Sequence, residues 1–151
     1  GRACGDIALY TSVAGGAEYV ILPEAPVDVD AIAASVKKGF DKGKTSTIIV
    51  LAEGRVDVKD ELMEKVKAST GRTVNHIALS YIQRGGTPSM FDRVLASRMA
   101  VRAVELIECG QSGRAVGVRG GDLIDMNVIE ALNYKKEFDT QLYNIAQKIS
   151  K

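Results

Sequence analysis

A short, continuous run of β-branched and apolar residues, Thr47-Ile-Ile-Val-Leu-Ala52, constrains the fold most strongly. Such a run is typical of a central strand in a parallel sheet, where both faces of the strand are covered. Residues 19–22 form a second brief apolar run, which Pro23 stops. Because amphipathic segments follow each run, the pattern predicts an α/β fold in which a parallel sheet carries helices on both faces.

Further segments fit the same alternation of strands and helices. A third strand is expected over residues 73–79, and a short strand over 114–118 is expected to return over 122–126. Helical spacing of apolar residues, with glycines or prolines near the boundaries, predicts six helices: residues 5–14, 29–40, 57–68, 88–108, 126–132 and 138–149.

Length and composition exclude several classes of protein. The chain has 151 residues and a formal charge of +1, which fits one domain and gives no electrostatic reason to expect nucleic-acid binding. No apolar stretch is long enough to predict a membrane span, and the first residues lack the apolar core of a signal peptide. Cys4 and Cys109 show no metal-binding spacing, which predicts free, buried thiols. These features predict a cytoplasmic protein.

A glycine-rich turn lies between the expected third strand and the longest helix. Arg84 precedes the pair Gly85-Gly86, and Thr87-Pro88-Ser89 then opens the helix. Glycines allow close approach of the backbone to a ligand, a helix start favours anions, and arginine matches phosphate geometry. The pattern therefore indicates a phosphate-binding turn. The alternative is a helix cap beside a solvated arginine.

Two further places carry candidate binding residues. Glu53 follows the strand at 47–52 and could accept hydrogen bonds from a sugar hydroxyl, with Gly54 leaving room for a ligand. The alternative is an exposed glutamate before a turn. The segments Gly16-Ala-Glu18 and Lys42-Gly-Lys44 could form a cationic patch in which Glu18 holds Mg²⁺ beside a diphosphate. The alternative there is a solvated helix end whose lysines complement the dipole.

The segment Tyr81-Ile-Gln-Arg-Gly-Gly-Thr-Pro-Ser, followed by Phe91-Asp-Arg-Val-Leu-Ala-Ser-Arg, closely resembles bacterial 6-phosphofructokinase. The resemblance runs along the whole chain but covers only the C-terminal half of that enzyme. The chain opens inside the family's Met-Gly-Arg motif without the methionine. On this resemblance it is expected to be a processed or expressed piece of a longer protein.

The resemblance implies roles for five residues in fructose 6-phosphate binding. Glu53 would bind a sugar hydroxyl and Arg84 the sugar phosphate. Gly1 and Arg2 would belong to the substrate loop, where Arg2 has a catalytic role in stabilising charge on the transferring phosphoryl oxygens. Tyr81 stands where the family has a histidine phosphate ligand.

The same resemblance marks a departure at Asn75, which replaces an arginine that reaches into the neighbouring subunit's site. It also places Gly16, Glu18, Lys42 and Lys44 in the family's allosteric site for ADP or phosphoenolpyruvate. Thr45 and Ser46 replace basic or histidine residues there, so weakened or lost effector binding is expected. A metal is expected in this half only at Glu18, through effector-bound Mg²⁺.

By resemblance, the complete glycolytic kinase transfers the γ-phosphoryl group of Mg-ATP to fructose 6-phosphate. Its aspartate base and ATP loop belong to the N-terminal half, so this chain is expected to be inactive alone and to bind neither ATP nor catalytic Mg²⁺ itself. The implied partners are fructose 6-phosphate, the N-terminal half and further copies in a tetramer. Residues 1–80 and 126–151 would form the sugar-phosphate lobe, and 81–125 part of the nucleotide lobe.

Two alternatives remain open from the sequence. The first is a non-catalytic sugar-phosphate-binding or regulatory module, because Asn75 and Tyr81 alter phosphate contacts. The second is part of a pyrophosphate-dependent phosphofructokinase, since Tyr at the histidine position resembles more distant branches of the superfamily.

Overall fold

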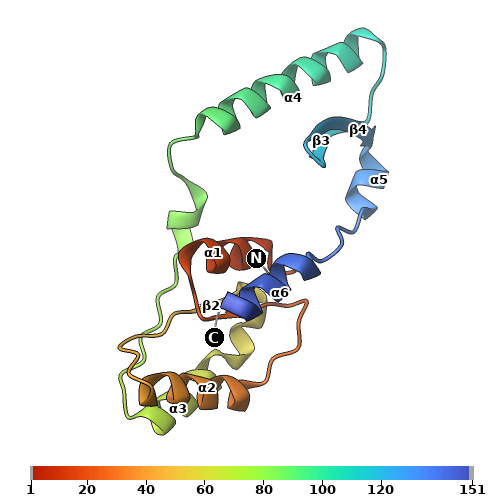
Figure 1. Ribbon diagram of the computed structural model, residues 1–151. Coiled ribbons are helices and arrows are strands. Elements are labelled where there is room, and N and C mark those ends of the chain that lie inside the picture. Colours follow the sequence, from red (N-terminus) through yellow and green to blue (C-terminus); the bar gives the residue numbers. More distant parts are fainter. Residues whose placement is uncertain (1, 150–151) are drawn as a thin grey trace. The chain divides into compact units, whose positions relative to one another are not determined.

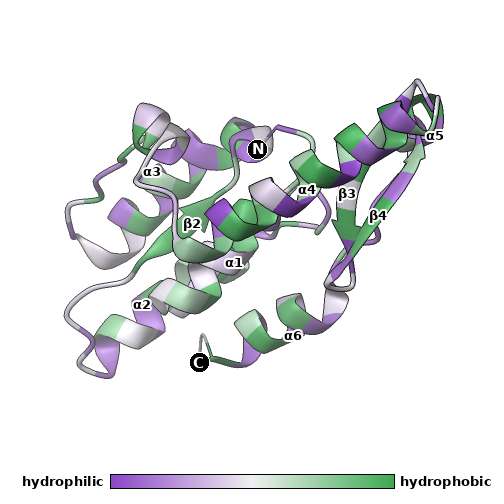
Figure 2. Ribbon diagram, turned by 90° about the horizontal axis from the view of Figure 1, so that it is seen from above, coloured by the Kyte–Doolittle hydropathy of each residue, from purple (hydrophilic) through white to green (hydrophobic). Residues whose placement is uncertain are grey.

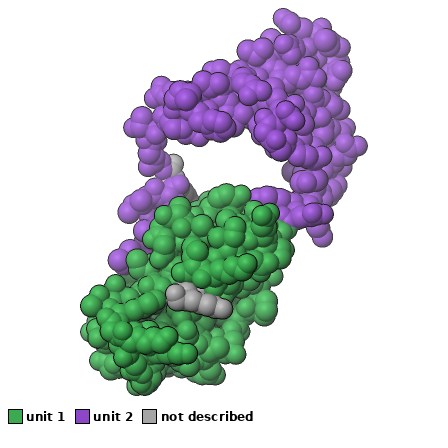
Figure 3. Space-filling view, viewed as in Figure 1, with its two compact units in different colours: residues 1–76, 138–151 green, residues 77–137 purple. Residues whose placement is uncertain are grey.

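The computed structural model describes residues 2–149, apart from the side chain of Arg84. The chain divides into two compact units, residues 1–76 with 138–151 and residues 77–137, which Figure 3 colours separately. Unit 1 thus combines the first half of the chain with the C-terminal helix. A parallel strand pair lies in unit 1 and an antiparallel pair in unit 2.

Unit 1 is built on two parallel strands. Its elements are α1 (Asp6–Gly15), β1 (Tyr19–Ile21), α2 (Val29–Asp41), β2 (Ile49–Leu51), the 3-10 helix η1 (Glu53–Val58), α3 (Lys59–Thr70) and α6 (Thr140–Ile149). Tyr19 lies opposite Ile49, and Ile21 lies opposite Leu51. The alternation of strand and helix confirms the predicted α/β fold (Figure 1).

The helices of unit 1 cover both faces of the strand pair, as predicted. Successive side chains of a strand point to opposite faces. Val20 and Leu22 accordingly pack into one core with α1 and α6, whereas Ile21 packs into a second core with α2 and α3. In Figure 2 the strand β2 is coloured as hydrophobic, while the helices mix polar and apolar residues. The apolar residues of these helices that are buried belong to the two cores on the strands.

Unit 2 contains η2 (Ser80–Arg84), α4 (Met90–Glu108), β3 (Arg114–Arg119), β4 (Asp122–Asn127) and α5 (Val128–Asn133). Strands β3 and β4 form an antiparallel hairpin, with Arg119 opposite Asp122. Gly120 and Gly121 make the two-residue turn and have φ of 61° and 93°. A hairpin turn with positive φ at both positions favours glycine. The predicted return of the strand is therefore confirmed.

The third strand predicted over residues 73–79 is wrong, because the structure forms no strand there. The sheet of unit 1 has two strands, and within residues 2–149 the second edge of β2 has no strand partner. A strand depends on the hydrogen-bonding ladder of its neighbour, so β-forming residues without such a ladder stay irregular. Val74 nevertheless packs against the second core.

An ionic cluster joins three elements of unit 2. The carboxylate of Asp125 on β4 lies 2.7 Å from Nη2 of Arg102 on α4 and 3.0 Å from Nε of Arg114 on β3. The Asp125 side chain is only 12% exposed. The hydrogen bonds from Arg114 and then from Arg102 lower the pKa of Asp125 below its ordinary value of 3.8.

We predict that Asp125→Asn lowers the melting temperature of the chain at neutral pH, because the two guanidinium groups lose their shared anion. Since the folded pKa of Asp125 is depressed, its stabilisation is fully present above 3.8 and is lost as pH falls through the lower folded value. Thermal melts of wild type and variant should therefore converge in acid. Asp122→Asn, in the same hairpin, is the control and should leave the melting temperature nearly unchanged. Equal melting of wild type and Asp125→Asn at pH 7 would contradict the cluster's role.

Candidate functional site

The carboxyl ends of β1 and β2 lie side by side, because the two strands are parallel and in register. Pro23 and Glu24 follow β1 closely, and Glu53 and Gly54 follow β2. The N-terminus of α1 reaches the same edge, where the backbone N–H of Gly5 donates to Oε1 of Glu24 at 2.8 Å. Carboxyl ends of parallel strands are the usual place for a ligand site in open α/β sheets.

The N-terminal segment is packed tightly against this edge. A Cβ placed on Gly54 would lie 2.0 Å from the carbonyl oxygen of Arg2 and 2.8 Å from Cγ of Pro23. The space beside Gly54 is therefore filled by the backbone of Arg2, rather than left for a ligand as the sequence predicted. Glycine is required here because of this close approach of two backbones.

Arg2 and Glu53, two residues predicted for the substrate site, form an ion pair. Nε of Arg2 donates to Oε1 of Glu53 at 2.7 Å, and their side chains are 86% and 59% exposed. This hydrogen bond, with the attraction between the two charges, raises the pKa of Arg2 above its ordinary value. The pair presents a hydrogen-bond acceptor and a permanent cation together at a solvent-exposed strand end. These are groups that can bind a hydroxyl and a phosphoryl oxygen respectively.

The other predicted substrate residues are distributed differently. Gly1 lies outside the described residues, and so does the side chain of Arg84. Tyr81 and the backbone of Arg84 belong to η2 in unit 2, and Tyr81 is 78% exposed. The structure therefore brings together Arg2 and Glu53 of unit 1.

The glycine-rich turn differs from the expectation in its backbone. Gly85 has a φ of −168°, which is ordinary extended backbone, so positive φ is not what glycine supplies there. Helix α4 begins with a capping box in which Oγ of Ser89 accepts from Asp92 N at 3.2 Å and Ser89 N donates to Oδ2 of Asp92 at 2.8 Å. The Ser89 hydroxyl also donates to Oδ2 of Asp92 at 2.7 Å, and this hydrogen bond, followed by that of Ser89 N, lowers the pKa of Asp92. The helix cap considered as the alternative interpretation is thus present at Ser89.

The second constellation lies at the amino ends of the same strands. Gly16 ends α1 with a φ of 67°, and Lys42 ends α2. Oε2 of Glu18 accepts the backbone N–H of Ile48 at 2.7 Å, and Oε1 lies 3.9 Å from Nζ of Lys44. Glu18 and Lys44 are therefore neighbours, and Glu18 also links the entry of β2 to β1.

Metal-binding and redox features are limited in the described part of the chain. No group of three or more His, Cys, Asp or Glu side chains is arranged for a metal within residues 2–149. Cys4 and Cys109 are free but exposed, so the prediction of buried thiols is wrong: one lies in the N-terminal segment and the other caps the end of α4. Among the helices that the structure describes, none is long and apolar enough to cross a membrane.

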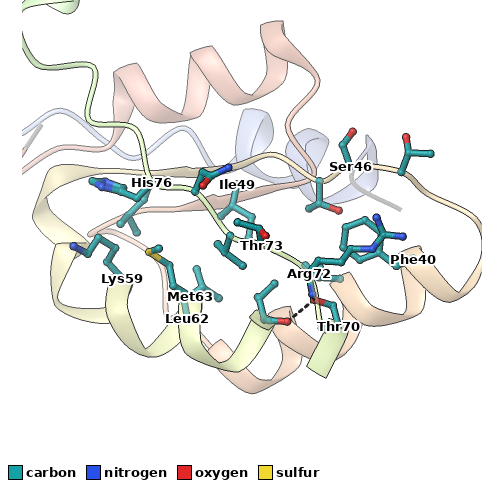
Figure 4. A pocket seen from close by; sticks show the side chains of 18 residues that line it. Phe40, Ser46, Ile49, Lys59, Leu62, Met63, Thr70, Arg72, Thr73 and His76 are labelled. Atoms are coloured by element: carbon teal, nitrogen blue, oxygen red, sulfur yellow. Dashed lines mark hydrogen bonds between the residues drawn. The ribbon is translucent and has the colours of Figure 1, made fainter. Parts of the chain in front are cut away.

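Two features of unit 1 were missed from the sequence. One is Glu24, which holds the N-terminus of α1; its position directly after a strand and a proline was the available signal. The other is an open cavity of about 630 Å³ between β2, α2 and α3, which residues 70–76 complete (Figure 4).

Comparisons with known proteins agree with this fold. The family profile described as PFK: Phosphofructokinase matches residues 1–107. An ATP-dependent 6-phosphofructokinase of Clostridium botulinum (strain Loch Maree / Type A3) is 48% identical over 151 residues, which are 100% of this chain and 47% of that protein. An ATP-dependent 6-phosphofructokinase of Clostridioides difficile (strain 630) is 45% identical over 150 residues, 99% of this chain and 47% of that protein.

A solved structure is also similar in fold. Pichia pastoris phosphofructokinase in the T-state superposes with a TM-score of 0.71 at 26% identity, over 99% of this chain and 16% of that chain. The fold and site define an α/β protein with an ionic pair where its parallel strands end. This chain belongs to the phosphofructokinase family. It spans about half the length (47%) of the curated relatives it matches.

We predict that Gly54→Ala destabilises the chain by roughly 1–3 kcal/mol, because the new methyl group cannot fit against the Arg2 backbone. Gly15→Ala is the matched control: its added Cβ would meet nothing within 4 Å at the end of α1. That control should melt at or above the wild-type temperature, since alanine favours helix. Thermal melts followed by circular dichroism measure both. Equal melting of Gly54→Ala and wild type would show that the N-terminal segment is not packed on Gly54.

Proposed function

We propose that this chain is the fructose 6-phosphate-recognising part of an ATP-dependent 6-phosphofructokinase. The whole protein would transfer the γ-phosphoryl group of Mg-ATP to the 1-hydroxyl of fructose 6-phosphate in glycolysis. The observation that carries this proposal is the exposed Arg2–Glu53 ion pair at the carboxyl ends of β1 and β2. Family membership and the names of the bacterial relatives support the same reaction.

Each proposed site residue has a distinct role. The Glu53 carboxylate accepts a hydrogen bond from a sugar hydroxyl, and Arg2 stabilises charge on the transferring phosphoryl oxygens. Gly1 belongs with Arg2 in the substrate loop. Arg84 and Tyr81 contact the 6-phosphate, with the tyrosine supplying a neutral hydroxyl.

The phosphoryl donor is proposed to be ATP, because the relatives are named as ATP-dependent enzymes. ATP and its Mg²⁺ supply the phosphoryl group and charge neutralisation, and the rest of the protein holds them. In this chain, residues 81–125 are proposed as part of the nucleotide lobe and residues 1–80 with 126–151 as the sugar-phosphate lobe. The complete enzyme is proposed to be a cytoplasmic tetramer.

The effector residues are proposed to be Gly16, Glu18, Lys42 and Lys44. One carboxylate beside a lysine fits a Mg²⁺ ion that arrives with a nucleoside diphosphate, because Mg²⁺ keeps phosphate and water ligands. A single carboxylate beside a lysine does not fit a metal ion that is held by protein side chains alone. The hydrogen bond of Glu18 to Ile48 N would then couple the effector position to the start of β2.

A non-catalytic sugar-phosphate-binding module is the second candidate, and Asn75 and Tyr81 favour it. Both residues replace family phosphate ligands by neutral groups. Charged hydrogen bonds contribute roughly 1.5–3 kcal/mol and neutral ones about 0.5–1.5 kcal/mol, so affinity for the sugar phosphate should be reduced but not abolished.

We predict saturable binding of fructose 6-phosphate to the purified chain in a calorimetric titration. Glu53→Gln and Arg84→Ala should each weaken binding roughly tenfold or more, because each removes one charge-assisted hydrogen bond. Glu64→Gln is the control, an exposed glutamate on α3. If Glu53→Gln binds as tightly as wild type, Glu53 is not a sugar ligand. If wild type does not bind, repeating the titration with the N-terminal half of a relative added separates an incomplete site from a degenerate one.

We predict that the purified chain alone has no phosphofructokinase activity, because the family's aspartate base lies in the other half. Adding the N-terminal half of a clostridial relative should produce ATP-dependent formation of fructose 1,6-bisphosphate. Arg2→Ala should then lower kcat far more than it raises KM, since the proposed role is in the transition state. Turnover by the isolated chain would refute the first expectation. A complemented enzyme that binds both substrates without turnover would favour the non-catalytic module.

A further inference from the structure

An open groove of about 630 Å³ lies entirely within unit 1. Its floor is apolar and is formed by side chains of β2, α2 and α3, among them Leu51, Val36 and Met63. Its rim is polar (Figure 4). Apolar hollows of this size with a few polar groups are the usual form of a small-molecule site.

The strand beneath the groove is incompletely covered. The residues of β2 are all partly exposed, although their β-branched, continuous sequence is that of a buried strand. Within residues 2–149, the second edge of β2 also lacks a strand partner. Covering this surface with apolar groups is favourable, so the groove favours a ligand with an apolar body.

The charge of the groove is one-sided. Its 18 lining residues include Lys59, Arg72 and His76, several hydroxyls, and no aspartate or glutamate. Nζ of Lys59 lies 3.0 Å from Oδ1 of Asp60, so Arg72 is the lining cation without an acidic partner among the ion pairs of residues 2–149. The whole chain has 19 acidic residues, so their absence from the lining is a local property. A hollow lined by one sign of charge attracts the opposite sign. The ligand that fits is therefore an anion.

The side chain of Arg72 is held in place at the groove, where it can bind an anion. Gly71 ends α3 with a φ of 67°, and Oγ1 of Thr70 accepts the backbone N–H of Arg72 at 3.2 Å. The guanidinium carbon then lies 4.2 Å from the centre of the Phe40 ring. In Figure 4 the Arg72 side chain lies beside Phe40 at one end of the groove. Stacking holds the plane of the guanidinium, whose paired donors match a carboxylate.

Arg72 also differs from the other arginines that the structure describes in unit 1. Arg2 pairs with Glu53 and Arg55 pairs with Asp57. No ion pair found within residues 2–149 involves Arg72. An arginine fixed by stacking and without a carboxylate of the protein is suited to a carboxylate of a ligand.

We propose that this groove binds a small amphipathic carboxylate. The anionic head pairs with Arg72, and the apolar body lies along β2 and α3 against Met63. A sugar phosphate has no apolar body, and the anionic head of a nucleotide is a phosphate. The proposed ligand class therefore differs from the substrate and from a nucleotide effector.

Octanoate is the probe, titrated into the purified chain carrying ¹³C-methyl methionine and followed by NMR. Of the four methionines, Met63 alone lines the groove, whereas Met90, Met99 and Met126 lie in unit 2. Saturable shifts of the Met63 methyl signal, with the other three unmoved, are expected. Arg72→Gln should weaken octanoate roughly tenfold, and the matched control Lys67→Gln on α3 should not.

Two further probes separate the parts of the ligand. The neutral analogue 1-octanol should bind more weakly than octanoate and should be insensitive to Arg72→Gln. Inorganic phosphate should leave Met63 unmoved. Circular dichroism checks that Arg72→Gln folds; if it does not, Phe40→Leu removes the stacking plane and should weaken octanoate selectively. The proposal is overturned if octanoate does not saturate at Met63, if all four methionines shift together, or if the folded charge or stacking variant binds as wild type does.

Discussion

The parallel pairing of β1 with β2 is the interaction on which the rest of unit 1 depends. It gives α1 and α6 one face to cover and α2 and α3 the other, so a three-residue ladder organises two cores. Because the strands are parallel and in register, the residues that follow them emerge at one edge. Glu24 and Glu53 are placed there by the ladder, and each then holds part of the N-terminal segment, at Gly5 and Arg2 respectively.

The two ends of this ladder have different chemistry. At the carboxyl end an exposed arginine and glutamate pair where the N-terminal segment packs on Gly54. At the amino end Glu18 accepts the N–H of Ile48, beside Lys44. A ligand that engages Glu18 would compete with the hydrogen bond at the entry of β2. The ladder thus offers a direct physical link between the proposed effector residues and the proposed substrate residues, only three residue pairs apart.

Much of the fold could be predicted from the sequence because its signals are local. The β-branched run at Thr47–Ala52, the helical spacing and the glycines at helix ends each constrain a few neighbouring residues. The strand expected over 73–79 failed because pairing is not local: it needs a ladder beside it. The site shows the same division. The position of Glu53 after a strand could be predicted from the sequence. The filling of the space beside Gly54 by Arg2, 52 positions earlier, could not, because it depends on tertiary packing. The stacking of Arg72 on Phe40 could not be predicted from the sequence either, for the same reason.

The central claim is that the carboxyl edge of the β1–β2 pair recognises fructose 6-phosphate through Glu53, with Arg2 beside it for the transferring phosphoryl group. The most direct measurement is an amide NMR titration of the chain with fructose 6-phosphate, compared with fructose and with inorganic phosphate. The account predicts saturable shifts centred on the amides of Gly5 and Gly54, larger for fructose 6-phosphate than for either part alone. Saturable shifts confined to other regions, with these amides unmoved, would contradict it.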